Sequence, residues 1–217
     1  MQSTHIIAIR HGETDWNALG RYQGQTDIPL NEAGLAQAKQ AAAFLRDKTI
    51  HAIYSSNLSR ASQTALEIAQ IRNEELRIIP ELREQHYGVF QGLTGSQVKE
   101  RWPDAHQKWH DRVPEFGPEG GETRNEFKER CIKALKQVAV QHPGEILAVV
   151  CHGGVLDCLY REAAKLPMDI ARTWPLENAA MNHLRYDENG FSLVDWGNIS
   201  HLEQAGRDEM KECFPGP

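Results

Sequence analysis

Ile6-Ile7-Ala8-Ile9-Arg10-His11-Gly12-Glu13 is the stretch that decides the fold, because it joins an apolar run to a polar turn. Four consecutive apolar residues of this kind are typical of a buried strand. In an open α/β sheet the ligand crevice lies beyond the carboxyl ends of the strands, and Arg10 and His11 are placed there. Gly12 would let a ligand approach the backbone closely. The stretch therefore predicts a sheet with a functional histidine at its edge.

A second stretch repeats this arrangement. Ile146-Leu147-Ala148-Val149-Val150 is another apolar run, and Cys151-His152-Gly153-Gly154 follows it directly. The carboxyl ends of parallel strands meet at the same edge of a sheet, so the two histidines are expected to share one site.

The composition limits the classes of protein to which this chain can belong. A chain of 217 residues with 40% hydrophobic and 25% charged residues fits one globular domain, or one domain with a modest insertion. A formal net charge of −6 argues against a general nucleic-acid or anionic-membrane binder, but it leaves room for a small cationic pocket. The expected partner is a small molecule. The chain has no apolar run of membrane-spanning length and no targeting pattern at its start, and we expect a cytoplasmic protein. Its four cysteines form no CxxC pair, which favours reduced thiols and no structural zinc.

The remaining segments alternate between strand and helix patterns. Apolar residues recur at helical spacing after Asn31, a candidate N-cap, after the capping box that begins at Thr123, and after His152. This alternation predicts an α/β fold, a three-layer sandwich with a mostly parallel central sheet and helices on both faces. The expected strands are residues 6–10, 51–55, 77–79 and 146–151, with an added hairpin of 184–186 and 191–196.

The pattern weakens between Gly92 and Gly121, where tryptophans, prolines and glycines replace regular periodicity. We interpret residues 93–121, called the insertion below, as a short lid with aromatic anchors. Its Trp102, Trp109, Phe116 and His110 are candidates to meet the organic part of the substrate. Residues 1–201 then form a single domain that includes the insertion. The polar segment 202–217 is expected to be a mobile tail.

Four segments in order along the chain carry a family resemblance. They are Arg10–Thr14, Ser55–Thr64, Leu82–Gly92 and Cys151–Gly154. Together they resemble the histidine phosphatase superfamily, also called phosphoglycerate-mutase-like, and in particular its short bacterial phosphatase branch. The resemblance implies metal-independent, cofactor-free hydrolysis of a phosphomonoester through a phosphohistidine, with His11 as the nucleophile and Glu84 as the proton donor.

The chemistry of these residue types agrees with that implication. A phosphoryl group carries charge on three oxygens, and the forked guanidinium groups of Arg10 and Arg60 can each bind two of them. Protonated His152 would add a third positive charge, while the arginines keep His11 neutral and able to attack phosphorus. Further candidates for contact with the substrate are Asn17, Gln23, Gly24 and the backbone N–H of Gly153.

Some of these residues have simpler interpretations or competitors. Glu81 and Glu13 are alternatives to Glu84 as the acid, and Asn17 could cap a turn. His106 and His110 have the spacing of a metal-binding pair, but no third ligand is evident and an exposed helix is the expected setting. No metal site is predicted.

The sequence also bears on activities other than hydrolysis at a histidine. A cysteine phosphatase would need an arginine six residues after Cys151, where the chain has Asp157. GxxxxGK[ST] and GxSxG motifs are also missing from the sequence. A cofactor-dependent phosphoglycerate mutase and a non-catalytic phosphate-binding module stay as alternatives, and the short insertion favours the hydrolase. The sequence does not fix an oligomeric state, and a homodimer is one option.

Overall fold

The computed structural model describes residues 2–204 and 206–208. Six strands form one sheet in the order β3-β2-β4-β1-β5-β6. Strands β1 to β4 are parallel to their neighbours within this group, whereas β5 is antiparallel to both β1 and β6. The predicted α/β sandwich with a mostly parallel sheet is therefore confirmed. The strands are β1 Thr4–Arg10, β2 Ala52–Ser55, β3 Leu76–Ile78, β4 Ile146–Cys151, β5 Met181–Asp187 and β6 Gly190–Asn198.

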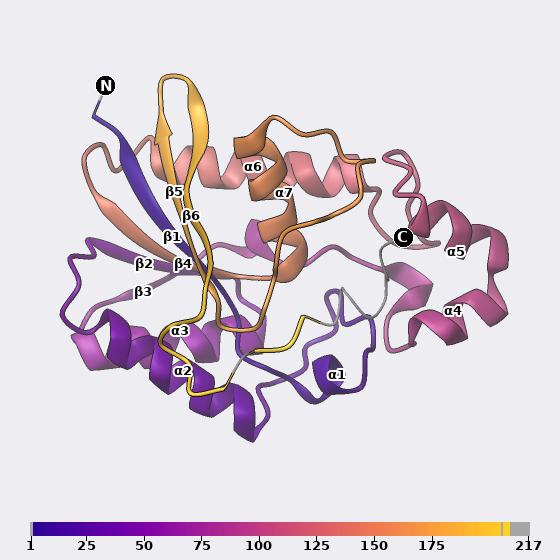
Figure 1. Ribbon diagram of the computed structural model, residues 1–217, viewed down its shortest axis with the longest axis horizontal. Coiled ribbons are helices and arrows are strands. Elements are labelled where there is room, and N and C mark those ends of the chain that lie inside the picture. Colours follow the sequence, from indigo (N-terminus) through magenta and orange to yellow (C-terminus); the bar gives the residue numbers. More distant parts are fainter. Residues whose placement is uncertain (1, 205, 209–217) are drawn as a thin grey trace.

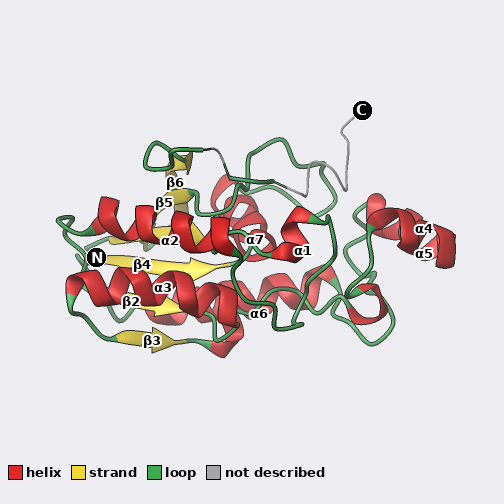
Figure 2. Ribbon diagram, turned by 90° about the horizontal axis from the view of Figure 1, so that it is seen from below, coloured by secondary structure: helices red, strands yellow, loops and turns green. Residues whose placement is uncertain are grey.

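Helices cover both faces of this sheet, as expected. Figure 1 shows α2 and α3 on one side of the strands and α6 and α7 on the other, and Figure 2 shows α2 and α3 side by side over the sheet. Asn31 and Thr123 cap α2 and α6 through their side chains, as their sequence context predicted. The helices are α1 Asp15–Ala18, α2 Glu32–Leu45, α3 Ser59–Arg72, α4 Gly95–Arg101, α5 Pro103–His110, α6 Arg124–Ala139 and α7 Gly153–Ala164.

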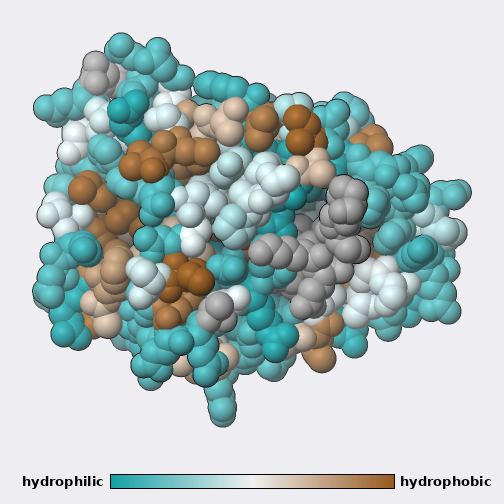
Figure 3. All heavy atoms as spheres, in the orientation of Figure 1, coloured by the Kyte–Doolittle hydropathy of each residue, from teal (hydrophilic) through white to brown (hydrophobic). Residues whose placement is uncertain are grey.

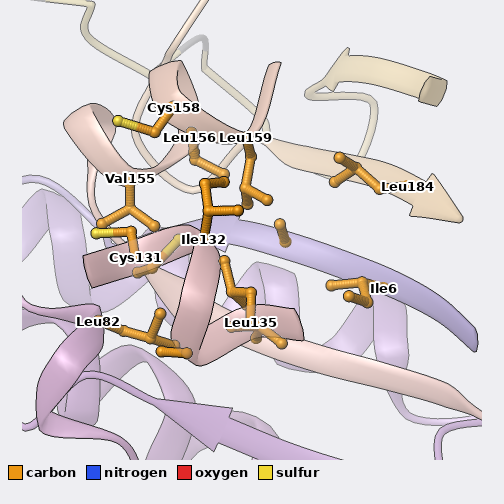
Figure 4. Close-up of a cluster of buried hydrophobic side chains, with 14 of the residues drawn as sticks. Ile6, Leu82, Cys131, Ile132, Leu135, Val155, Leu156, Cys158, Leu159 and Leu184 are labelled. Atoms are coloured by element: carbon orange, nitrogen blue, oxygen red, sulfur yellow. The ribbon is translucent and has the colours of Figure 1, made fainter. Parts of the chain in front are cut away.

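The hydrophobic core is divided by the sheet. Alternate residues of β1 face opposite sides, so Ile6 packs among α6 and α7 while Ile9 packs against α2 and α3. Figure 4 shows Ile6 with Leu135 and Leu159 in the larger of these two clusters. Cys151 is fully buried in the same cluster, so its thiol acts as a small apolar side chain behind the sheet edge.

The insertion folds as a separate small unit beside the sheet. It contains α4 and α5, which lie beyond the end of the sheet toward which the arrow of β4 points (Figure 2). Trp109 of α5 and Val98 of α4 are buried against Phe90, Tyr22 and Tyr87. Trp109, with Trp102 and Phe116 packed nearby, therefore belongs to a small separate core, although the sequence had suggested that these side chains could meet the substrate.

The surface of the described residues has mixed hydropathy. In Figure 3 apolar residues form separate patches among hydrophilic ones on the face shown. None of the helices in the described part of the chain is both long enough and apolar enough to span a bilayer.

The turn after β1 is packed tightly against the first turn of α2. A Cβ on Gly34 would lie 2.0 Å from the backbone oxygen of Glu13, and a Cβ on Gly12 would lie 2.4 Å from the oxygen of Gly34. Neither backbone atom can move without shifting the turn that carries His11. Glycine at both positions thus allows α2 to support the histidine.

We predict that Gly34→Ala destabilises the protein by about 1–3 kcal/mol, because the clash outweighs the higher helix propensity of alanine. The free energy of unfolding from urea titrations at neutral pH measures the effect. Gly95→Ala is the control, since a Cβ there would meet Tyr22 at an ordinary 3.9 Å. Equal stability of Gly34→Ala and the unsubstituted protein would contradict this account of the turn.

Candidate active site

The two histidines lie at the ends of neighbouring parallel strands. Strands β1 and β4 pair so that Arg10 is opposite Cys151, and one more step along each strand places His11 beside His152. The centres of the two imidazole rings are 5.2 Å apart. The structure therefore brings together the two residues that the sequence pattern placed at one sheet edge.

The ring of His11 is held in one orientation. Its Nδ1 lies 2.7 Å from the backbone oxygen of Gly12, which accepts a hydrogen bond when Nδ1 carries the proton. The Nε2 atom of that tautomer has the free lone pair. Burial is the largest cause that lowers the pKa of His11 well below its usual value, and the charges of Arg60 and Arg10 lower it further. His11 is thus neutral at physiological pH, as expected, although burial contributes more than the arginines.

Backbone carbonyls position the two flanking arginines. The Nη1 atom of Arg10 donates to the oxygen of Leu176, and both terminal nitrogens of Arg60 donate to carbonyls, Nη1 to Thr26 at 3.0 Å and Nη2 to Gly24 at 2.7 Å. Burial lowers the pKa of Arg60 to about 10, so its guanidinium stays charged at neutral pH. Two fixed positive charges consequently lie next to neutral His11.

Glu84 is a buried carboxyl group close to this charge cluster. Its Oε1 accepts from the backbone N–H of Gln85 at 2.8 Å, and its Oε2 accepts from that of Gly154 at 3.0 Å. Burial raises the pKa of Glu84, and these two hydrogen bonds only partly offset that rise. A Cβ on Gly154 would lie 2.2 Å from Oε1, so glycine is needed for this approach. Glu84 is thus poised to hold or release a proton.

An arginine outside the four motifs supports the loop that carries Glu84. Arg130 on α6 forms two 2.7 Å contacts with the carboxylate of Glu122, and its guanidinium also donates to the backbone oxygens of Glu81, Arg83 and Glu84. Sequence reasoning missed this support because its partners are about 50 positions away. Glu122, which directly follows the insertion and lies eight positions before Arg130, was the available signal.

His152 is fully buried in the ligand-free protein. Burial, followed by the charge of Arg60, lowers the pKa of His152 well below its usual value, so it is neutral in the ligand-free protein. Neither of its ring nitrogens has a hydrogen-bond partner among the described residues, although both are buried. Such an arrangement is costly unless a ligand supplies the partner.

His11, Arg10, Arg60 and Glu84 line one cavity, and His152 packs behind its wall, next to His11. Gln23, Gly24 and Gly153 contribute to its wall, as expected, whereas Asn17 does not. The carboxamide oxygen of Asn17 instead accepts from the N–H of Thr14 and closes the cap of α1. Arg21, Tyr22 and Tyr87 also line the cavity, although sequence reasoning did not single them out. The complete wall consists of Arg10, His11, Arg21, Tyr22, Gln23, Gly24, Arg60, Glu84, Tyr87 and Gly153.

Part of the expected mobile tail packs against the turn that carries the site. The guanidinium of Arg207 pairs with Glu13 at 2.8 Å, and its backbone oxygen lies 3.4 Å from Nη1 of Arg10. Asp208 accepts two hydrogen bonds from Arg172. Residues 205 and 209–217 lie outside the described part of the chain.

The competing residues are arranged differently. Glu81 is exposed, and the carboxylate of Glu13 is paired with Arg207, so neither resembles the buried Glu84. His106 and His110 stack on α5, with His110 exposed. Within residues 2–204 and 206–208, no group of three or more potential metal-ligating side chains gathers.

Comparisons with known proteins agree with this geometry. A family model described as "Histidine phosphatase superfamily (branch 1)" matches residues 6–199. The chain is 37% identical over 206 residues to "Metal-independent phosphoserine phosphatase" of Arabidopsis thaliana, covering 94% of this chain and 85% of that protein. It is 31% identical over 215 residues to "Probable phosphoglycerate mutase GpmB" of Photorhabdus laumondii, covering 95% and 98%. The solved structure of Bacillus stearothermophilus YhfR matches with a TM-score of 0.86 and 29% identity, covering 92% and 100%.

Proposed function

The chain belongs to the histidine phosphatase superfamily, and from that premise we propose which of its residues carry out each step of catalysis. Membership makes the protein a phosphomonoester hydrolase that acts through a phosphohistidine on a small phosphorylated metabolite. The observation that carries the residue assignment is the single cavity that joins neutral His11, two buried arginines and a buried carboxyl group.

In the first step the Nε2 lone pair of His11 attacks phosphorus. An N–P bond forms while the ester P–O bond breaks, and the carboxyl proton of Glu84 goes to the departing alkoxide. Arg10 and Arg60 bind the equatorial oxygens of the phosphoryl group, where charge is carried in the transition state. The N–H of Gly153 at the start of α7 donates to the same group, in line with anion binding at helix N-termini.

In the second step water replaces the histidine. Glu84, now a carboxylate, takes a proton from a water molecule whose oxygen attacks phosphorus, and the P–N bond breaks. Inorganic phosphate leaves and neutral His11 is restored. His11 and Glu84 thereby return to their starting protonation states, and the two steps use no metal or organic cofactor.

His152 acts after the phosphoryl group has bound. Two or more negative charges beside an imidazole favour its protonated form, so substrate binding raises the pKa that burial and Arg60 had lowered. One ring nitrogen then donates to a phosphoryl oxygen. The protonated His152 that was expected around a bound phosphoryl group thus belongs to the substrate complex and stays a prediction. Asn17 could donate through its amide NH₂ group, which stays a prediction.

Phosphoglycerate mutase is the second candidate, since one relative carries that name. We predict that incubation with 3-phosphoglycerate, with and without 2,3-bisphosphoglycerate, releases mainly free phosphate, because a short insertion leaves the phosphohistidine open to water. Quantifying phosphate and 2-phosphoglycerate distinguishes the two activities. Predominant formation of the 2-isomer would make the protein a mutase.

A small metabolite as substrate also supports a cytoplasmic location. Cys131, Cys151 and Cys158 are free and buried, as suits a reducing compartment, and Cys213 lies outside the described residues. The formal net charge of −6 likewise supports a small-molecule substrate rather than a nucleic acid.

A further inference from the structure

A third arginine, Arg21, lies in the wall of the same cavity. It follows α1, and its backbone pairs with Thr94 in an isolated antiparallel bridge. The Nη1 atom of Arg21 donates to the backbone oxygen of Gly92 at 2.5 Å. Arg21 is thus fixed where the motif segment that carries His11 meets the insertion.

Arg21 has different anchors from the two arginines next to His11. Its side chain donates to Gly92 and its backbone pairs with Thr94, so it is tied to the edge of the insertion. Arg10 and Arg60 donate instead to backbone oxygens outside the insertion. With a phosphoryl group held by His11, Arg10 and Arg60, Arg21 would be available to the alcohol part of the ester.

The charge of Arg21 has no internal counterpart. Arg21 forms no ion pair with any acidic residue between positions 2 and 204 or 206 and 208. Its hydrogen bond to Gly92 uses one terminal nitrogen, Nη1. The Nε and second terminal nitrogen are left for solvent or a ligand. A half-buried guanidinium in this state matches a carboxylate, whose two oxygens accept parallel hydrogen bonds from the planar fork.

We propose that Arg21 binds a carboxylate on the alcohol part of the substrate, so that the enzyme prefers phosphomonoesters of small hydroxy acids. The inference rests on the proposed function, because it places the phosphoryl group at His11. Arg21 would determine specificity without taking part in bond formation. Its hydrogen bond to Gly92 couples binding of the carboxylate to the position of the insertion.

Phosphoserine and phosphoethanolamine test the proposal, since they differ by one carboxylate. We expect the unsubstituted enzyme to prefer phosphoserine in kcat/KM by at least about 10-fold. Arg21→Gln should lower kcat/KM for phosphoserine by about 10- to 100-fold, mainly by raising KM. The fold-loss in kcat/KM for phosphoethanolamine should be at least about 10 times smaller. Arg21→Lys should keep part of the preference, because it retains the charge without the fork.

Arg101→Gln is the matched control, because it removes an exposed arginine near the end of α4 and should leave both substrates unaffected. Equal losses for both substrates in Arg21→Gln would assign Arg21 a structural role at Gly92 and overturn the proposal. A lack of preference in the unsubstituted enzyme would overturn it as well. Failure to hydrolyse any phosphomonoester would instead refute the proposed function.

Discussion

His11→Ala is expected to lower kcat for phosphomonoester hydrolysis by at least about 10⁴-fold and to abolish formation of a phosphoenzyme. The reason is that alanine has no nucleophilic nitrogen, so Arg10 and Arg60 would surround a position from which no side chain can attack phosphorus. Water would have to attack directly, without the low barrier that a neutral, oriented imidazole provides. Residual activity would come from electrostatic stabilisation by Arg10 and Arg60 alone.

The phosphoenzyme provides the more specific measurement. Incubation with ³²P-labelled substrate, followed by a denaturing alkaline quench, should label the unsubstituted protein, and the label should be lost in acid, as is typical of an N–P bond. His11→Ala should remain unlabelled. His110→Gln is the control, because this exposed histidine lies on α5 and should leave both turnover and labelling unchanged. Label on the His11→Ala protein would assign the nucleophile to another residue.

Local sequence pattern was sufficient to predict the sheet edge. Apolar runs ending at Arg10 and Cys151 predicted adjacent parallel strands, and the register of β1 and β4 brings their following histidines together. The Asn31 cap and the Thr123 capping box predicted the starts of α2 and α6 because capping depends on residues three positions apart. Such short-range interactions can be read from one sequence.

Long-range contacts were not predictable in this way. Arg130 reaches backbone oxygens about 50 positions away, and Arg207 contacts Glu13 from the other end of the chain. The neutral state of His152 in the ligand-free protein was not predictable either, because the extent of its burial depends on the packing of the whole domain. Arg21 was not predicted as a cavity residue because its contacts are also long-range. Its backbone pairs with Thr94, and its side chain lines the cavity.

Glu84→Gln is expected to lower kcat for an alkyl phosphomonoester by about 10²- to 10⁴-fold, because the leaving alkoxide loses its proton donor and the attacking water loses its base. p-Nitrophenyl phosphate separates the two steps, since nitrophenolate departs as an anion. With this substrate, Glu84→Gln should release up to one nitrophenolate per site in a rapid burst and then turn over slowly. The phosphohistidine should accumulate in this variant.

The pH profile provides a second measurement of the same group. The first step needs neutral His11 and protonated Glu84, so activity requires a pH above the pKa of His11 and below that of Glu84. An ordinary histidine titrates above an ordinary glutamate, which would leave no such window. Burial lowers the pKa of His11 and raises that of Glu84, and both shifts act to open the window. The acid limb of kcat/KM should thus fall below the ordinary histidine value of about 6.5. The alkaline limb should disappear in Glu84→Gln.

Glu81→Gln is the control for both measurements, because this exposed carboxylate lies in the same loop and was a competing candidate from sequence. Its rate and pH profile should match those of the unsubstituted enzyme. If Glu84→Gln retained full turnover of alkyl esters, another group would have to move the proton. Glu13 would not readily replace it, since its carboxylate pairs with Arg207 at 2.8 Å and accepts from Asn31 at 3.0 Å. Loss of turnover in Glu84→Gln without the nitrophenolate burst would restrict Glu84 to a structural role at Gly154, because its two backbone hydrogen bonds would then be its whole contribution.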